Sequence, residues 1–213
     1  MKKFYLLFIL STFFLDGCID IAEEITINPD LSGTASFNMD LGSLGGLAMK
    51  MGENYVQSSM LDQIKNIPSS AAALLKGLDG ISNIKPISNK SGLYSISFDF
   101  KNQKQLNQAI YKLFDVKKHF FEPNYIKITK KKLVKKNYAP MLRLYMKKYQ
   151  DQIKDKSMLK YLSYKSIIHF PNEVKKFSNN KSTLSSDKKT LEYTCTIDEL
   201  LSSGVDIGNK VKY

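Results

Sequence analysis

Polar and apolar residues alternate in the part of the chain that follows residue 18. In segment 21–28 isoleucines occupy one side except at Glu23, and segment 34–41 alternates in the same way. A period of two places the apolar side chains on one face of a β-strand. Asp30 and Gly33 between the segments are typical of a tight turn, and we expect Gly33 to adopt the left-handed conformation that closes it. The pattern predicts an antiparallel hairpin with one buried face.

The same alternation returns further along the chain. Residues 94–100 alternate regularly and, with residues 81–87, predict a second hairpin around a polar turn. The last regular strand places Cys195 among its inward-facing residues. The other predicted strands cover residues 125–134, 164–170, 175–178, 191–197 and 205–211, the last as an edge strand or tail.

Helical spacing replaces the alternation in several segments. Leu106, Ile110 and Leu113 fall on one side of a helix predicted over residues 102–115. The other predicted helices cover residues 55–67, which Pro68 ends or kinks, 71–78, 139–162 and 198–204. Hairpins with helices between them predict the α+β class, as an antiparallel β-sheet built from hairpins with helices packed on one face.

The first 18 residues form a separate unit. Lys2 and Lys3 precede the apolar segment 4–15, which is shorter than the ~20 residues that a membrane-spanning helix requires. Leu15-Asp16-Gly17-Cys18 then resembles the lipobox of bacterial lipoproteins, although Asp16 departs from the usual pattern. The resemblance implies cleavage between Gly17 and Cys18 and acyl chains such as palmitate on Cys18. The alternatives are an ordinary secretory signal with an incidental cysteine, or an uncleaved anchor.

This leader divides the chain into a signal peptide, residues 1–17, and a single extracytoplasmic α+β domain, residues 18–213. With Cys18 assigned to lipid, Cys195 has no partner for an internal disulfide, so the core must stabilise the domain. His119 and His169 stand apart from any cluster with metal-ligand spacing. We therefore expect neither a metal nor another cofactor.

The net charge of +12 is unevenly distributed. Residues 101–165 hold 18 basic and 4 acidic residues, and Arg143 is the only arginine in the chain. Sequence-specific nucleic-acid recognition favours arginine, so we expect no nucleic-acid partner. The candidate contacts to an anionic surface are Lys130, Lys131, Lys132, Lys135, Lys136, Lys147 and Lys148. The alternative is that an AT-rich genome has placed lysine at solvated positions.

Short strings at both ends of the domain carry a family resemblance. They are the turn Asp30-Leu31-Ser32-Gly33 directly after the first strand, the segment Phe170-Pro171-Asn172-Glu173-Val174, and the segments 184–191 and 198–201. In these strings the chain resembles bacterial LppM-like lipoprotein domains. The resemblance implies an exported α+β domain with an apolar cavity for lipids or glycolipids, and it carries over no catalytic residue.

The sequence contains no recognisable catalytic motif. The closest string to a nucleophile elbow, Leu41-Gly42-Ser43-Leu44-Gly45, lacks the required spacing, and no phosphate-binding loop is present. Glu23 and Glu24 are adjacent on a strand and therefore face opposite sides. We therefore expect that the protein is not an enzyme.

Two functions agree with these features. In the first, the domain is a non-catalytic binding module held at a membrane by lipid on Cys18, and its lysines meet anionic lipid, glycan or an envelope protein. In the second, it is a structural or assembly factor of the cell envelope that acts through a protein partner. Ile19 is not the aspartate that retains some lipoproteins at the inner membrane, so an outer membrane is preferred where two membranes exist.

Overall fold

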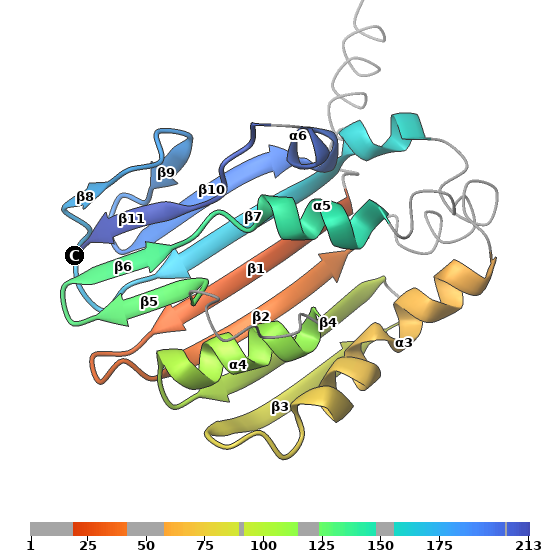
Figure 1. The fold of residues 1–213 in the computed structure, drawn as a ribbon, viewed down its shortest axis with the longest axis horizontal. Coiled ribbons are helices and arrows are strands. Elements are labelled where there is room, and N and C mark those ends of the chain that lie inside the picture. The colour runs from red at the N-terminus through yellow and green to blue at the C-terminus, as the bar shows by residue number, and fades with distance from the viewer. Residues whose placement is uncertain (1–18, 42–57, 90–91, 115–123, 148–155, 203) are drawn as a thin grey trace, which may run out of the picture.

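The computed structural model describes residues 19–41, 58–89, 92–114, 124–147, 156–202 and 204–213. Cys18, His119 and Lys148 lie outside the described residues, as does the predicted start of the first helix at Tyr55. The described chain forms two β-sheets and several helices (Figure 1). The α+β class is therefore confirmed.

A seven-stranded sheet forms the centre of the fold. Its strand order is β3-β4-β2-β1-β7-β10-β9. The strands are β1 (Ile19–Ile27), β2 (Gly33–Asp40), β3 (Ile81–Ser88), β4 (Leu93–Phe100), β7 (Leu162–His169), β9 (Ser182–Leu184) and β10 (Thr190–Thr196). Both predicted hairpins are present, because β1 pairs antiparallel with β2 and β3 pairs antiparallel with β4.

The sheet is mixed, which corrects the expectation of a sheet built only from antiparallel hairpins. β1 and β7 are parallel, in a register that runs from Ile19 opposite Leu162 to Thr26 opposite His169. A hairpin turn fixes an antiparallel direction, whereas a strand that enters after a long connection is free to run either way. β7 follows β1 in the chain only after β2 to β6, α3, α4, α5 and η2, so no local turn sets its direction.

A smaller sheet of four strands has the order β5-β6-β11-β8. The strands are β5 (Ile126–Thr129), β6 (Lys132–Lys135), β8 (Lys176–Phe177) and β11 (Asn209–Lys212). The single strand predicted over residues 125–134 is therefore a tight hairpin that turns at Lys130 and Lys131. The last strand, predicted as an edge or tail, lies inside this sheet because β11 pairs with both β6 and β8.

The helices are α3 (Ser58–Leu75), α4 (Gln103–Leu113), α5 (Ala139–Lys147), the 3₁₀ helix η2 (Lys156–Tyr161) and α6 (Ile197–Leu201). α4 begins where predicted, because the Asn102 side chain accepts a hydrogen bond from the backbone N–H of Lys104 at 2.9 Å. α3 runs on through Pro68, so the predicted pair of helices is one helix. Figure 1 shows α4, α5 and the small sheet on the same side of the large sheet.

The core lies between the large sheet and these covering elements. One apolar cluster joins the sheet to α3, α4 and the small sheet, and Ile25, Phe98 and Leu106 are fully buried in it. A second cluster lies near the start of β1 and includes Leu200. Cys195 belongs to this second cluster and is a free, buried thiol, as its place in the strand pattern predicts.

The turn between β1 and β2 differs in detail from its prediction. Leu31, not Gly33, has the positive φ of 70°. Gly33 is required for space instead, since a Cβ there would lie 1.9 Å from the carbonyl oxygen of Thr26 and 2.6 Å from the Phe100 ring. The hairpin therefore depends on this glycine for the close approach of β1, β2 and the Phe100 side chain.

The burial of Cys195 predicts an unreactive thiol. Burial raises the pKa of the Cys195 thiol above its usual value, and the thiolate is the reactive form. In a Cys18→Ser variant, where Cys195 is the sole thiol, we expect a colourimetric thiol reagent to react only after denaturant is added. Rapid reaction of the native protein would contradict the position of this side chain.

Candidate functional site

The outer face of the small sheet is lined by lysines. Lys132 on β6, Lys212 on β11 and Lys176 on β8 are direct partners across three adjacent strands. The next row on the same face contains Lys127, Val134 and Lys210. Five lysine side chains are exposed on this face, and we call this surface the lysine sheet: Lys127, Lys132, Lys176, Lys210 and Lys212.

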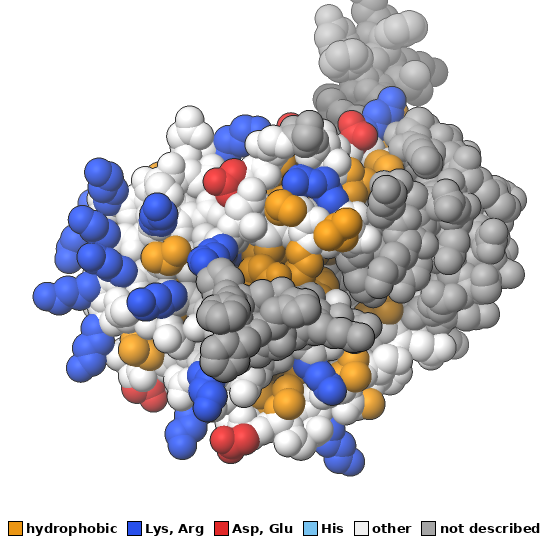
Figure 2. All heavy atoms as spheres, in the orientation of Figure 1, with side chains coloured by type: hydrophobic (Ala, Val, Ile, Leu, Met, Phe, Trp, Pro, Cys, Tyr) orange, Lys and Arg blue, Asp and Glu red, His pale blue; other side chains and the backbone are white. Residues whose placement is uncertain are grey.

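Like charges placed directly opposite one another in a sheet destabilise it. None of these five lysines forms an ion pair with a carboxylate among the described residues. Figure 2 shows the lysine and arginine side chains crowded at the end of the molecule where Figure 1 places β5, β6, β11 and β8. The lysine sheet is thus a concentrated positive surface whose charge is not neutralised by the described part of the chain.

Most of the lysines predicted as surface contacts lie at or beside this sheet. Lys130 and Lys131 are exposed in the β5–β6 turn, Lys132 is a member of the lysine sheet, and Lys136 is exposed after β6. Lys147 is the last residue of α5, and Lys148 lies outside the described residues.

Lys135 corrects the prediction. Its side chain is buried, with 2% of the residue exposed, because β6 turns residues 133 and 135 toward the large sheet. A lysine in this position cannot contact a surface. The run of lysines around it gave no sign of which members would face inward.

Lys176, Lys210 and Lys212 were missed as candidates. They come from the last third of the chain, where basic and acidic residues nearly balance. The available signal was local: Lys210 and Lys212 alternate with Asn209 and Val211, so both lysines share one face of a strand. Sequence separation hid the fact that this strand pairs with β6.

Lys135 lies at the centre of a buried polar cluster between the two sheets. Its Nζ donates to Glu23 Oε2 at 2.9 Å and to Ser166 Oγ at 2.5 Å. Glu23 is 2% exposed, so this is a fully buried ion pair. Two tyrosines complete the cluster, because the hydroxyls of Tyr138 and Tyr164 also donate to Glu23 Oε2.

Tyr164 of this cluster stays protonated. Burial raises the pKa of Tyr164 well above its usual value, and the charge of Glu23 and its hydrogen bond raise it further. The hydroxyls of Tyr138 and Tyr164 are also 2.9 Å apart. The Tyr164 hydroxyl is thereby kept as a donor to the carboxylate, which helps to satisfy the buried charge.

A lysine beside a serine hydroxyl is one known way to activate a nucleophile. Here the Lys135 ammonium is bound to a carboxylate, and Ser166 is 4% exposed. The cavity that these two residues share with Tyr193 and Asn209 has a volume of about 10 Å³, the size of one water molecule. The arrangement therefore suits the joining of two sheets and leaves no room for a substrate.

The opposite face of the large sheet carries polar side-chain contacts of its own. Glu24 contacts His169 at 2.8 Å, and Asp20 contacts Lys165 at 2.7 Å. Partial burial alone would raise the pKa of Asp20, but hydrogen bonds from Lys165 and Ser163 outweigh it and hold that pKa below its usual value. Glu23 and Glu24 thus lie on opposite faces, as the strand pattern predicts.

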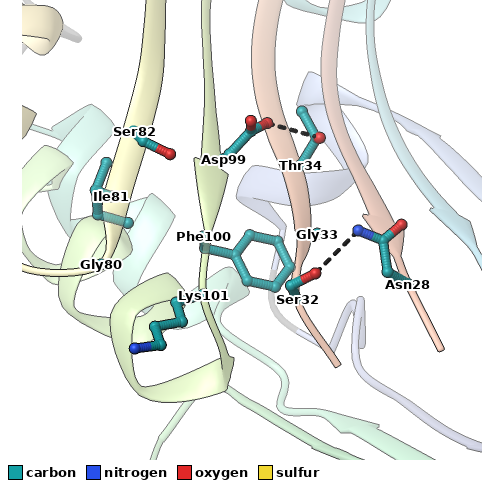
Figure 3. Close-up of a pocket in the computed structure, with 10 residues that line it drawn as sticks. All are labelled: Asn28, Ser32, Gly33, Thr34, Gly80, Ile81, Ser82, Asp99, Phe100 and Lys101. Carbon is teal, nitrogen blue, oxygen red and sulfur yellow. Dashed lines mark hydrogen bonds between the residues drawn. The ribbon is translucent and has the colours of Figure 1, made fainter. Parts of the chain in front are cut away.

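An open pocket of about 550 Å³ lies at the far end of the β1–β2 hairpin (Figure 3). Several polar side chains that line the pocket form hydrogen bonds with one another or with a neighbouring residue. Thr34 donates to Asp99 at 2.9 Å, Asn28 donates to Ser32 at 3.0 Å, and Asn83 also donates to Asp99. This is not the apolar cavity between sheet and helices that the family resemblance implies.

Among the described residues, no group of three or more His, Cys, Asp or Glu side chains could hold a metal ion. In the same part of the chain, no helix has both the length and the apolar character needed to cross a membrane.

Fold and surface together define an α+β domain with a mixed central sheet and a basic second sheet. No protein-family model matches the chain, and no curated protein matches it. Among solved structures, the chain is similar to the NMR structure of the folded domain of LppM from Mycobacterium tuberculosis. The identity is 10%, the match covers 92% of this chain and 88% of the LppM domain, and the TM-score is 0.41.

The buried ion pair predicts a characteristic pattern of stabilities. Lys135→Met leaves Glu23 buried without its cation, and Glu23→Leu leaves Lys135 without its carboxylate. We expect each single variant to lower the free energy of unfolding by about 3–5 kcal/mol. The double variant should recover most of that loss, because no unpaired charge remains. Denaturant titrations measure all three values, and additive losses in the double variant would contradict the pairing.

Proposed function

We propose that this chain is an exported lipoprotein of the cell envelope, anchored by acyl chains on Cys18, and that its domain is a non-catalytic binding module. The lysine sheet is the observation that carries the binding role, because three of its cations face one another across neighbouring strands. An anionic ligand relieves that repulsion. The ligand bears phosphate or carboxylate groups, as anionic lipid headgroups and envelope glycans do.

The chemistry of the lysine sheet favours a ligand with many dispersed charges. Arginine presents a planar fork that fits one phosphate or carboxylate, whereas lysine is a compact point charge on a flexible stem. Neighbouring strands lie about 4.8 Å apart, so the row Lys132, Lys212, Lys176 presents cations at that interval. A polyanion or an anionic surface matches such a row better than a single small anion does.

The anchor and the lysines contribute different energies. Each buried CH₂ of an acyl chain contributes about 0.8 kcal/mol to membrane binding, while each lysine near an anionic surface contributes only about 1 kcal/mol and is screened by salt. The acyl chains on Cys18 therefore retain the protein at the membrane. The lysine sheet supplies selective and reversible binding.

A protein partner is the second candidate. Ile67 and Leu74 lie seven residues apart on α3 and are 49% and 42% exposed, and Ile87 on the adjacent strand β3 is 43% exposed. Apolar side chains exposed together favour a protein contact. Co-purification of one envelope protein, without any binding of polyanions, would support this role as an assembly factor over the first.

Lipidation predicts a specific mass and thiol count. We expect the mature protein to begin at Cys18, to carry acyl chains, and to show one free thiol in denaturant, that of Cys195. Intact mass spectrometry and thiol titration measure both properties. The Cys18→Ala variant should lose the acyl mass and fail to float with liposomes. A wild-type protein that is cleaved elsewhere, or that shows two free thiols, would refute the anchor.

Binding by the lysine sheet is tested on lipidated protein in neutral phosphatidylcholine liposomes, with soluble polyphosphate as the probe. Replacing Lys132, Lys176 and Lys212 with Gln removes about 3 kcal/mol of attraction, so we expect about 100-fold weaker binding. Added salt should weaken wild-type binding in the same direction. The free energy of unfolding should not fall, because the substitutions remove like-charge repulsion.

The matched control replaces three exposed lysines elsewhere. Lys101, Lys104 and Lys112 lie on or next to α4, and their replacement by Gln changes the net charge by the same amount. We expect this variant to bind polyphosphate almost as well as the wild type. If both triple variants lost polyphosphate affinity equally, binding would depend on net charge alone. The lysine sheet would then not be the binding site.

A further inference from the structure

The end of the domain where β1 begins has an unusual exposed surface. Ile19 pairs with Leu162, so Tyr161 lies beside the point where the chain continues to Cys18. Tyr161 is 58% exposed, and Lys160 places its Nζ 5.1 Å from the centre of the Tyr161 ring. A tyrosine and a lysine thus stand together at the end of the domain where β1 begins, and the first residue of β1, Ile19, directly follows Cys18 in the sequence.

A large aliphatic side chain is exposed on a neighbouring helix. Leu144 of α5 is 69% exposed. α5 and η2 both pack on α6, and the Arg143 guanidinium fixes α5 there by donating to the carbonyl oxygen of Ser202 at 3.0 Å. Leu144 and Tyr161 therefore belong to elements that are held against the same short helix.

Single exposed apolar residues are normal on protein surfaces, so exposure alone assigns no role. The combination and its place are the informative features. Tyrosine has an apolar ring with a polar tip, and lysine has an apolar stem with a charged tip. Both side chains favour the boundary between lipid and water. Here they directly precede Leu162, the residue that pairs with Ile19 at the start of β1.

We propose that Lys160, Tyr161 and Leu144 form a membrane seat, in which these side chains enter the headgroup layer of the membrane that holds the lipid of Cys18. This inference rests on the proposed lipidation and adds the orientation of the domain. No linker separates Cys18 from β1, because Ile19 is already part of the strand. The acyl chains and the membrane seat therefore act at the same end.

The lysine sheet lies at the other end of β1. Lys135 contacts Glu23 in the middle of the strand, and Lys132 lies three residues further from the Ile19 end. Tyr213, next to Lys212, packs against Phe170 with ring centres 4.8 Å apart, beyond the last residues of β7. Figure 1 agrees, since β1 begins near α5 and α6 and runs toward the left side of the picture, where the C-terminus lies.

The separation between the two surfaces follows from these positions. Four steps along β1 from Ile19 to Glu23 and three along β6 from Lys135 to Lys132 span about 23 Å at ~3.3 Å per step. This distance exceeds the Debye length of about 8 Å at physiological ionic strength. With the membrane seat engaged, the lysine sheet faces away from the anchoring membrane, and its ligand is an anionic group of the surrounding envelope space.

Tryptophan fluorescence tests this orientation, because the chain contains no tryptophan. Lipidated Tyr161→Trp protein is reconstituted in liposomes of phosphatidylcholine with phosphatidylglycerol, with and without lipids brominated in the upper acyl chain. We expect a blue-shifted emission and strong quenching by the brominated lipids. Leu144→Trp supplies a second probe of the same end and should be quenched as well.

The control probe is Val134→Trp, which lies on the outer face among Lys127 and Lys210. It should emit at the wavelength of solvent-exposed tryptophan and resist quenching. Quenching at residue 134, with or without quenching at 161, would overturn the orientation, and so would quenching at none of the three positions. Intact mass and liposome flotation, measured beforehand, show whether Cys18 carries lipid. If it carries none, both the anchor and the membrane seat are refuted.

Discussion

The buried ion pair between Glu23 and Lys135 determines how the two sheets fit together. These residues are 112 positions apart in the sequence and join β1 of the large sheet to β6 of the small one. Side chains alternate along a strand, so an inward Lys135 requires an inward Leu133 and outward Lys132 and Val134. A shift of one residue would bury Lys132 and expose Leu133. The pair therefore also determines which lysines reach the surface.

The surrounding hydroxyls make this pair tolerable in the core. A buried charge is costly unless its partner and its remaining hydrogen bonds are all satisfied. Glu23 receives donors from Lys135, Tyr138 and Tyr164, and Lys135 also donates to Ser166. The cluster lies between two apolar clusters, so packing on both sides separates it from bulk water. A wrong register would leave these polar groups without partners, which favours one arrangement of the sheets.

Local patterns in the sequence predict the elements well, and distant pairings poorly. Alternation identifies both hairpins, and the helical spacing after Asn102 identifies α4, because neighbouring residues set these features. The parallel pairing of β1 with β7 depends on residues far apart and left no local sign. Lys135 sits in a run of lysines and Glu23 looked like a polar interruption, so neither residue revealed its burial. Only opposite charges at inward positions of two strands could have suggested their pairing.

The lysine sheet also helps to decide whether the many lysines result only from the base composition of the genome. A compositional bias fills solvated positions wherever they occur along the chain. Here lysines from three separate segments meet in one row across β6, β11 and β8, where their mutual repulsion works against the fold. Other contacts of the sheet can offset this repulsion. Leu133 and Val211, on the inner face of the same strands, are almost fully buried. The apolar inner face thus stabilises a sheet whose outer face is strongly charged.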